Sequence, residues 1–214
     1  MSLLNPFTAA KEDIKVSNEL KDFLTDFSIE VMPRTSAKIE SFTEILPKNT
    51  RVYIAHIEGV PIEEMVQTAK RISSEGFAVM PHFPARIIKN KNILEQWIKM
   101  YQDEAGIDQA LLLAGGVVSP HGDFKDSMQL VETELFEKYH FKNLHFAGHP
   151  EGNKDIDYDG STKNIDEALI WKQSYSERSD IDLAITTQFC FEADPVIEWA
   201  NSLIENGINI PIHI

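Results

Sequence analysis

Short apolar runs alternate with longer segments of helical spacing from residue 27 to residue 214 of this chain. The apolar runs are rich in β-branched residues, which is typical of buried strands. We predict strands at residues 27–31, 52–56, 78–80, 109–113, 144–147, 183–186 and 210–214. Strands that alternate with helices are usually parallel and joined by right-handed crossovers, so the pattern predicts an α/β fold.

Six helices are predicted between these strands, and several residues mark their ends. Pro61 and Pro195 stand where a first helical turn accepts a missing N–H, and Asp194 has the side chain of an N-cap. Gly76 and Gly207 follow predicted helices, where a left-handed residue often ends the helix. The predicted helices cover residues 37–46, 61–74, 93–104, 125–139, 165–176 and 195–206.

The seven predicted strands favour a (β/α)8 barrel of the TIM type over an open doubly wound sheet. The first strand of a doubly wound sheet usually leads into a glycine-rich phosphate loop, but residues 30–34 contain no glycine. A TIM barrel typically has about 250 residues. We therefore expect residues 27–214 to form a barrel domain without its eighth strand–helix unit. Residues 1–26 are predicted to be an N-terminal extension with one helix over residues 18–25.

Composition excludes several classes of function. The chain has 20 Lys and Arg residues against 34 Asp and Glu residues, and this net charge of -14 opposes binding to nucleic acid or to an anionic membrane. No apolar run approaches the roughly 20 residues that span a bilayer. Residues 1–15 lack the pattern of a signal peptide. The single cysteine, Cys190, excludes an internal disulfide and a Cys-based zinc site, and we predict a cytoplasmic protein.

Polar residues stand at the predicted carboxyl ends of the strands, where barrel enzymes carry their active sites. A carboxylic acid, several imidazoles and an amide converge there, and this combination suits general acid chemistry on a nitrogen heterocycle. The residues at these ends are Glu30, His56, Glu58, His82, His149, Glu151 and Gln188.

Glu30 is the predicted proton donor. Its sequence neighbours Phe27, Ile29 and Val31 are apolar, and an apolar rim would raise the pKa of the carboxyl group. Two other interpretations stay open for Glu30, as a solvated acid at the end of a strand or as the partner of Arg34.

Other polar residues have structural interpretations. His82 and His149 each lie beside a proline, and a lone loop histidine is more often structural than catalytic. Their separation, with no carboxylate at ligand spacing, gives no reason to predict a metal site. Cys190, between two phenylalanines, is expected to pack in the core. Residues 155–160 alternate like a calcium loop, but the twelfth position is Asp166 and not glutamate, so we expect a solvated loop.

Five segments, in order along the chain, resemble motifs of the methylenetetrahydrofolate reductase family. Residues 28–34 (SIEVMPR) are similar to its Ser-Phe-Glu-Phe-Phe-Pro-Pro motif, and residues 81–83 (PHF) to its Pro-His-Leu loop. Residues 146–152 (FAGHPEG) resemble Val-Ala-Gly-Tyr-Pro-Glu-Gly, and residues 185–194 (ITTQFCFEAD) resemble Ile-Thr-Gln-Leu-Phe-Phe-Glu-Ala-Asp. Residues 207–212 (GINIPI) match Gly-Ile-x-x-Pro-Ile.

The resemblance implies an activity and roles for residues. In this family FAD takes hydride from NADH or NADPH and passes it to 5,10-methylenetetrahydrofolate, which gives 5-methyltetrahydrofolate. Glu30 would be the catalytic acid, and Gln188 and Phe191 would bind the folate. The implied cofactor-binding residues are His82, Ala147, His149, Glu151, Asn153 and Lys172.

The sequence departs from the family around the flavin. Ala114, Gly115 and Gly116 stand where the family has Arg-Gly-Asp, and His149 and Asn153 replace a tyrosine and a histidine. Two alternatives therefore stay open. One is a flavin-free folate-binding protein that acts in tetrahydrofolate-dependent methyl transfer or demethylation. The other is a non-catalytic barrel subunit, and either a homo-oligomer or a partner subunit is compatible with the sequence.

Overall fold

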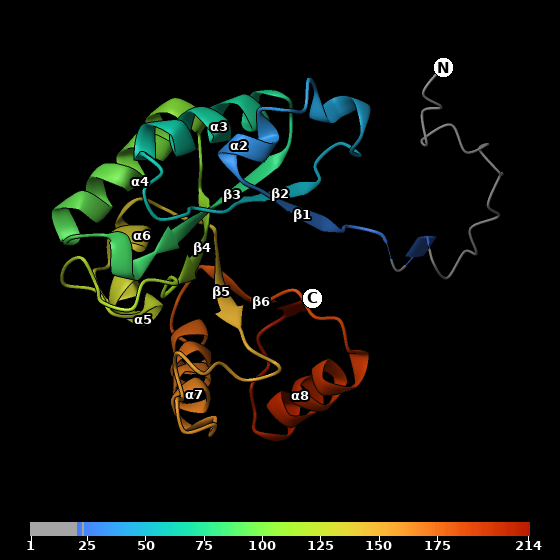
Figure 1. Ribbon diagram of the computed structural model, residues 1–214, viewed down its shortest axis with the longest axis vertical. Helices are drawn as coiled ribbons and strands as arrows, with labels where there is room; N and C mark the ends of the chain where they lie inside the picture. The colour runs from blue at the N-terminus through green and yellow to red at the C-terminus, as the bar shows by residue number, and fades with distance from the viewer. Residues whose placement is uncertain (1–20, 23) are drawn as a thin grey trace, which may run out of the picture.

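A curled sheet of parallel strands forms the centre of the protein (Figure 1). The computed structural model describes residues 21, 22 and 24–214. In this part, seven strands pair in the order of the sequence, and no pairing joins the last strand to the first, so the sheet is a half-barrel. The strands are β1 (Ser28–Val31), β2 (Arg51–Ile54), β3 (Ala78–Pro84), β4 (Gln109–Leu113), β5 (Asn143–Gly148), β6 (Asp182–Thr187) and β7 (Ile212–His213).

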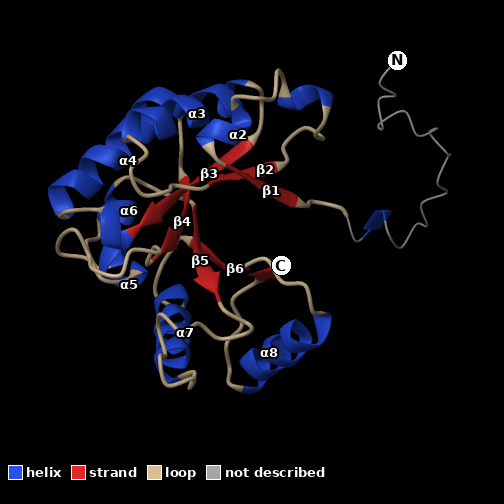
Figure 2. Cartoon of the chain, viewed as in Figure 1, coloured by secondary structure: helices blue, strands red, loops and turns tan. Residues whose placement is uncertain are grey.

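The helices lie outside the curl of the sheet and leave its concave face uncovered (Figure 2). This arrangement follows from crossovers of one hand between strands that are neighbours in sequence. The helices are α2 (Pro33–Ser36), α3 (Ile62–Ser74), α4 (Lys91–Ala105), α5 (Ser127–Val131), α6 (Leu135–Lys138), α7 (Lys163–Ser176) and α8 (Ala193–Glu205), with 3-10 turns η1 (Phe42–Glu44) and η2 (Ala85–Ile87). The predicted α/β class and all seven strands are confirmed, although β3 is longer and β7 shorter than expected.

Successive side chains of each strand point to opposite faces of the sheet and lie in two different environments. Residues such as Val52, Leu112 and Ile185 belong to the large apolar core, which packs between the sheet and the helices. A second, smaller apolar cluster joins Tyr53 and Leu111 with Met80 and Leu113. Because side chains alternate across a strand, this second cluster belongs to the concave face.

The helix predicted over residues 37–46 is wrong. Pro33 begins α2 directly after β1, and the N–H of the Ala37 C-cap already closes that helix. Arg71 of α3 then donates hydrogen bonds to main-chain carbonyls of Ser36, Ile39 and Glu40. These contacts use carbonyl oxygens that a continuing helix would need for its own N–H groups. The segment therefore crosses α3 as a loop that ends in η1.

The helix predicted over residues 125–139 is also wrong, because it is interrupted between α5 and α6. Glu134 adopts a left-handed φ of 61°, which breaks the helical hydrogen-bond series. The Thr133 hydroxyl donates to the Leu130 carbonyl at 2.6 Å, and Lys91 Nζ donates to the Thr133 carbonyl at 2.8 Å. Side-chain bonds to local carbonyls compete with the helix in this way. Two short helices therefore replace one long helix on the outside of β4 and β5.

The predicted helix ends agree in part with the structure. Gly76 and Gly207 follow α3 and α8 with φ values of 91° and 77°, which confirms the left-handed ends. Pro61 is the N-cap of α3 instead of its first residue. Asp194 was predicted as the N-cap of the last helix, but Glu192 has that position and Asp194 lies inside the first turn.

The predicted N-terminal helix over residues 18–25 lies mostly outside the described residues. Lys21 and Asp22 are helical and Thr25 lies in a turn. The division at residue 26 into an extension and a barrel domain stays a prediction. Among residues 21–22 and 24–214, no helix is long and apolar enough to cross a membrane.

Tyr101 provides a test of the packing between α4 and β3. Its side chain is fully buried against the ring of Phe83, with centroids 5.4 Å apart, and its hydroxyl has no hydrogen-bond partner among the described residues. An unpaired buried hydroxyl costs about 1 to 3 kcal/mol. We expect Tyr101→Phe to raise the free energy of unfolding by about 1 kcal/mol in urea denaturation.

Tyr139→Phe is the matched control. The Tyr139 hydroxyl donates to Glu95 Oε1 at 2.6 Å, so the same substitution there should lower the free energy of unfolding. A loss of stability in Tyr101→Phe comparable to that in Tyr139→Phe would contradict the description of the Tyr101 hydroxyl as unpaired.

Candidate functional site

Glu30 and His82 form an ion pair between β1 and β3 on the concave face. Glu30 Oε2 lies 3.2 Å from His82 Nε2, and the exposed fractions of the two side chains are 58% and 10%. Ile29 and Val31, on either side of Glu30, pack into the core, so the strand directs the carboxylate to the opposite face. The contact falls outside hydrogen-bond geometry, and the buried Nε2 has no other partner in the described chain. The Glu30 carboxylate is therefore the nearest polar group that the described chain offers to this nitrogen.

The prediction of a raised pKa for Glu30 is wrong. Its contact with His82 and the charge of that imidazole lower the pKa, and they outweigh partial burial, which raises it. The apolar neighbours in sequence lie on the other face of the sheet and do not form a rim around the carboxylate. Of the two other interpretations, a partly solvated acid describes Glu30, whereas its partner is His82 and not Arg34.

The carboxyl ends of β5 and β6 border a cavity of about 320 Å3. Five of the predicted site residues line it, which are Ala147, His149, Glu151, Asn153 and Gln188. Burial is the main reason that the pKa of His149 lies below its ordinary value, and the charge of Lys172 lowers it further. His149 is consequently neutral at pH 7. It offers one donor and one acceptor nitrogen.

A second cavity, of about 490 Å3, shares Ala147 and His149 with the first and extends toward α7. Lys172 lines this cavity with only 6% of its surface exposed. Its Nζ donates to the Ala147 carbonyl at 3.3 Å and lies 5.3 Å from the centre of the Phe146 ring. No carboxylate lies within 4 Å of it among the described residues, and burial lowers its pKa to about 8 despite the charge of Asp126. Asp126, Asp155 and Glu167 also line the cavity, so an anionic group would be favoured at Lys172 itself and not by the lining as a whole.

Arg86 was not predicted, although it lines both cavities. Its guanidinium donates to the main-chain carbonyls of Lys125 at 2.9 Å and Val117 at 3.2 Å. Arg86 thereby fixes the loop between β4 and α5 against the cavities. The same strand-end rule would have found it, but the predicted third strand ended at residue 80, whereas β3 continues to Pro84.

Other predicted residues do not share these cavities. Glu30 and His82 line neither of them. Phe191 is 88% exposed, and its ring packs edge-on against Phe189 at 4.8 Å. The expectation that Cys190 packs in the core is wrong, since its side chain is only partly buried beside the 320 Å3 cavity and its Sγ donates to the Gln188 carbonyl at 2.9 Å. The loop after β6 therefore presents two aromatic rings to its surroundings.

Two further polar residues have structural roles. His56 stacks on Trp97, and its Nε2 lies 3.0 Å from the Val60 carbonyl. Asp157 is buried and accepts hydrogen bonds from the main-chain N–H groups of Asn164 and Ile165 at the start of α7. The prediction of a solvated loop is thus wrong for Asp157. No group of three or more His, Cys, Asp or Glu residues that could hold a metal ion occurs in the described ranges.

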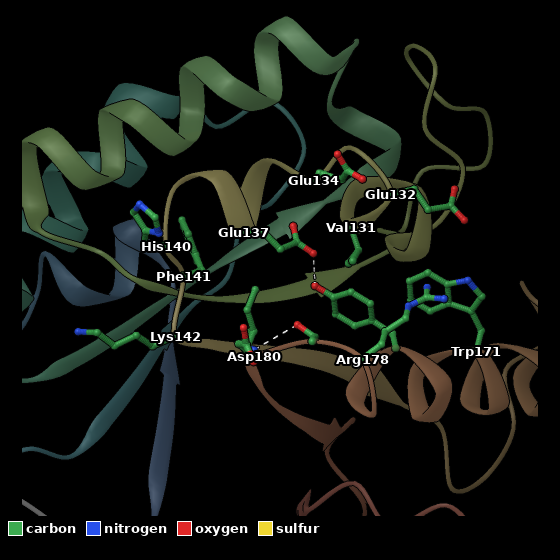
Figure 3. Close-up of a pocket in the computed structure, with 13 residues that line it drawn as sticks. Val131, Glu132, Glu134, Glu137, His140, Phe141, Lys142, Trp171, Arg178 and Asp180 are labelled. Atoms are coloured by element: carbon green, nitrogen blue, oxygen red, sulfur yellow. Dashed lines mark hydrogen bonds between the residues drawn. The ribbon is translucent and has the colours of Figure 1, made fainter.

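A cavity of about 750 Å3 lies between α6 and α7 (Figure 3). The Tyr175 hydroxyl donates to Glu137, the Trp171 ring stacks on Tyr175, and Arg178 lies over both rings. The lining of this cavity also includes Lys142, the residue before β5. Because it lies away from the carboxyl ends of the strands, we do not assign the chemistry to it.

The geometry therefore defines a candidate active site with two parts at one end of the half-barrel. One part is the Glu30–His82 ion pair, which can exchange a proton with a ligand. The other is the pair of cavities at β5 and β6, with a neutral imidazole and a buried ammonium group. No model of a known protein family matches the chain.

Lys172 gives a test of the unpaired charge. The decrease of its pKa from 10.5 to about 8 corresponds to about 3 kcal/mol of destabilisation by the buried charge. We expect Lys172→Met to raise the free energy of unfolding at pH 7 by 1 to 3 kcal/mol, about what the buried charge costs. Because the unfolded chain binds more protons between pH 8 and 10.5, the wild type should gain stability across that window.

Urea denaturation at pH 7 and at pH 10 measures both effects. The difference between Lys172→Met and the wild type should shrink at the higher pH. Lys163→Met, an exposed position on the same helix, is the control and should show no such pH-dependent difference. A stability difference that is the same at both pH values would show that the Lys172 charge is compensated.

Proposed function

We propose that this chain is a methylenetetrahydrofolate reductase-like flavoenzyme that reduces 5,10-methylenetetrahydrofolate to 5-methyltetrahydrofolate. The proposal includes the finer fold assignment, a (β/α)8 barrel of the TIM type without its eighth strand–helix unit. One observation carries it. Residues from two separate motifs line a single cavity next to the buried Lys172, namely Ala147 at the end of β5 with His149 to Asn153 of the following loop, and Gln188 after β6.

The residues present fit a flavin dinucleotide. Lys172 is a buried ammonium group without a carboxylate partner in the described chain, and a diphosphate would supply the missing negative charge. Ala147 and His149 belong to both cavities and would hold the part of the cofactor that crosses between them. Bound FAD would supply hydride transfer, with NADH or NADPH as the reductant. Glu151 and Asn153 would contribute polar contacts from the same loop.

Glu30 would supply the proton that opens the five-membered ring of the folate. The proton goes to the ring nitrogen that leaves, the carbon–nitrogen bond breaks with its electron pair on that nitrogen, and an iminium ion remains. In the ligand-free protein the lowered pKa keeps Glu30 ionised at pH 7. A folate ring that covers the carboxylate would remove water from it and raise its pKa. His82 Nε2, 3.2 Å away, would position the carboxylate and share its proton.

The proposal predicts a separation between folate chemistry and flavin binding. We expect Glu30→Gln to lower the rate of folate reduction by at least about 100-fold, because the amide cannot donate the proton. The amount of FAD bound per chain, measured by absorbance, should stay unchanged because Glu30 does not line the flavin cavities. Glu63→Gln, an exposed acid on α3, is the control for the loss of one charge. Near-normal folate reduction by Glu30→Gln would exclude the proposed role.

A flavin-free folate-binding protein is the second candidate. Ala114, Gly115 and Gly116 line the 320 Å3 cavity and bring no charge to it, where the related family has an arginine and an aspartate. Such a protein would bind tetrahydrofolate through Gln188 and Glu30 and act in methyl transfer or demethylation. Purification distinguishes the two, since a yellow protein that releases FAD supports the reductase and a colourless protein that binds folate supports this second function. A protein that binds neither ligand would favour the non-catalytic subunit.

A further inference from the structure

The opposite end of the half-barrel contains a second cation, Arg51, that has no carboxylate partner in the described part of the chain. Arg51 is the first residue of β2, and its side chain is partly buried on the concave face. Its Nε is buried and has no hydrogen-bond partner, and no carboxylate lies within 4 Å of the guanidinium among residues 21–22 and 24–214. A guanidinium group stays protonated and presents five N–H donors. A partly buried group of this kind requires an acceptor.

The neighbouring side chains do not provide a counter-charge. The Tyr53 hydroxyl lies 2.8 Å from His145 Nδ1 and 3.2 Å from the Thr186 hydroxyl, and it also interacts with the Arg51 guanidinium. Burial raises the pKa of Tyr53, so this hydroxyl is neutral and brings no negative charge to Arg51. Burial lowers the pKa of His145 to about 3, with contributions from the charge of Arg51 and from His213. The rings of His145 and His213 lie 4.8 Å apart and are neutral at pH 7. The cluster on the concave face therefore carries one net positive charge, on Arg51.

A cavity of about 640 Å3 opens beside Arg51 at the amino ends of β1, β2 and β3. Lys48 also lines it, so two cations face one space, with Asp26 as the one opposing carboxylate in its lining. Phe27 and Ala78 supply apolar walls. This volume exceeds that of a single inorganic ion and suits a small organic molecule with an anionic end.

We propose that this cavity is a binding site for a small molecule that bears a phosphate group, with Arg51 as the main ligand of the phosphate and Lys48 as a second cation. The planar guanidinium donates two parallel hydrogen bonds to a phosphate, and a phosphate carries close to two negative charges. The site lies at the end of the strands opposite to the proposed folate site, and it does not depend on the proposed reductase activity.

Inorganic phosphate is the probe for a test on the full chain. In a phosphate-free buffer, phosphate is expected to raise the melting temperature saturably and to give a binding isotherm, whereas sodium chloride of equal ionic strength should not. Arg51→Gln is expected to weaken phosphate binding about tenfold or more, the equivalent of one charge-assisted hydrogen bond. Without phosphate, Arg51→Gln should be as stable as the wild type or more stable, because it removes an unpaired charge.

Three variants complete the test. Arg34→Gln removes an exposed arginine and should bind phosphate like the wild type. Arg51→Lys keeps the charge but not the paired donors, so it should bind phosphate several-fold more weakly than the wild type. This variant replaces Arg51→Gln in the test if Arg51→Gln does not fold. Lys172→Met should still bind phosphate at Arg51, and this result would distinguish the Arg51 site from the cavity near β5.

Several results would overturn the proposal. These are the absence of saturable phosphate binding by the wild type, unchanged binding by Arg51→Gln or by Arg51→Lys, and loss of binding in Lys172→Met alone. A large loss of stability in Arg51→Gln without phosphate would also overturn it, because Arg51 would then have a partner within the chain.

Discussion

Parallel pairing of strands in sequence order is the constraint on which the rest of the structure depends. Each crossover has the same hand, so the helices cover one side of the sheet and the sheet curls away from them. The outer side chains form the large apolar core with the helices. None of the helices in the described ranges packs against the inner side chains. The concave face is consequently free to carry polar residues, which a face buried by helices could hold only at a high cost.

The polar residues of the concave face differ in how they are neutralised. Near the middle of the sheet, Tyr53, His145 and Thr186 bond to one another and stay uncharged. Toward the carboxyl ends, Glu30 and His82 form an ion pair. Arg51, at the amino end, has no such partner in the described chain. Neutral networks stabilise a sheet, whereas charges that protein groups do not satisfy are typical of ligand sites.

Features set by local pattern could be predicted from the sequence, and features set by distant contacts could not. The seven strands follow from runs of β-branched residues, and the left-handed residues Gly76 and Gly207 follow from their place after a helix. The segment after α2 has helical spacing, but hydrogen bonds from Arg71, more than thirty residues away in sequence, hold it as a loop. The environment of Cys190 is likewise set by tertiary structure and not by local pattern. A cysteine between two phenylalanines can belong to a core or to an exposed loop, and here both phenylalanines are exposed.

The pKa of Glu30 shows why site chemistry is harder to predict than site position. The strand-end rule placed Glu30 at the carboxyl end of β1, where the structure has it, but the sequence neighbours that suggested an apolar rim point to the other face. The residue that sets the pKa is His82, which only the order β1–β2–β3 brings within 3.2 Å. A carboxylate that is half exposed and paired with an imidazole is an ionised group in the free protein. If it acts as an acid, the substrate itself must change its environment, and removal of water from the carboxyl group on binding would raise the pKa in this way.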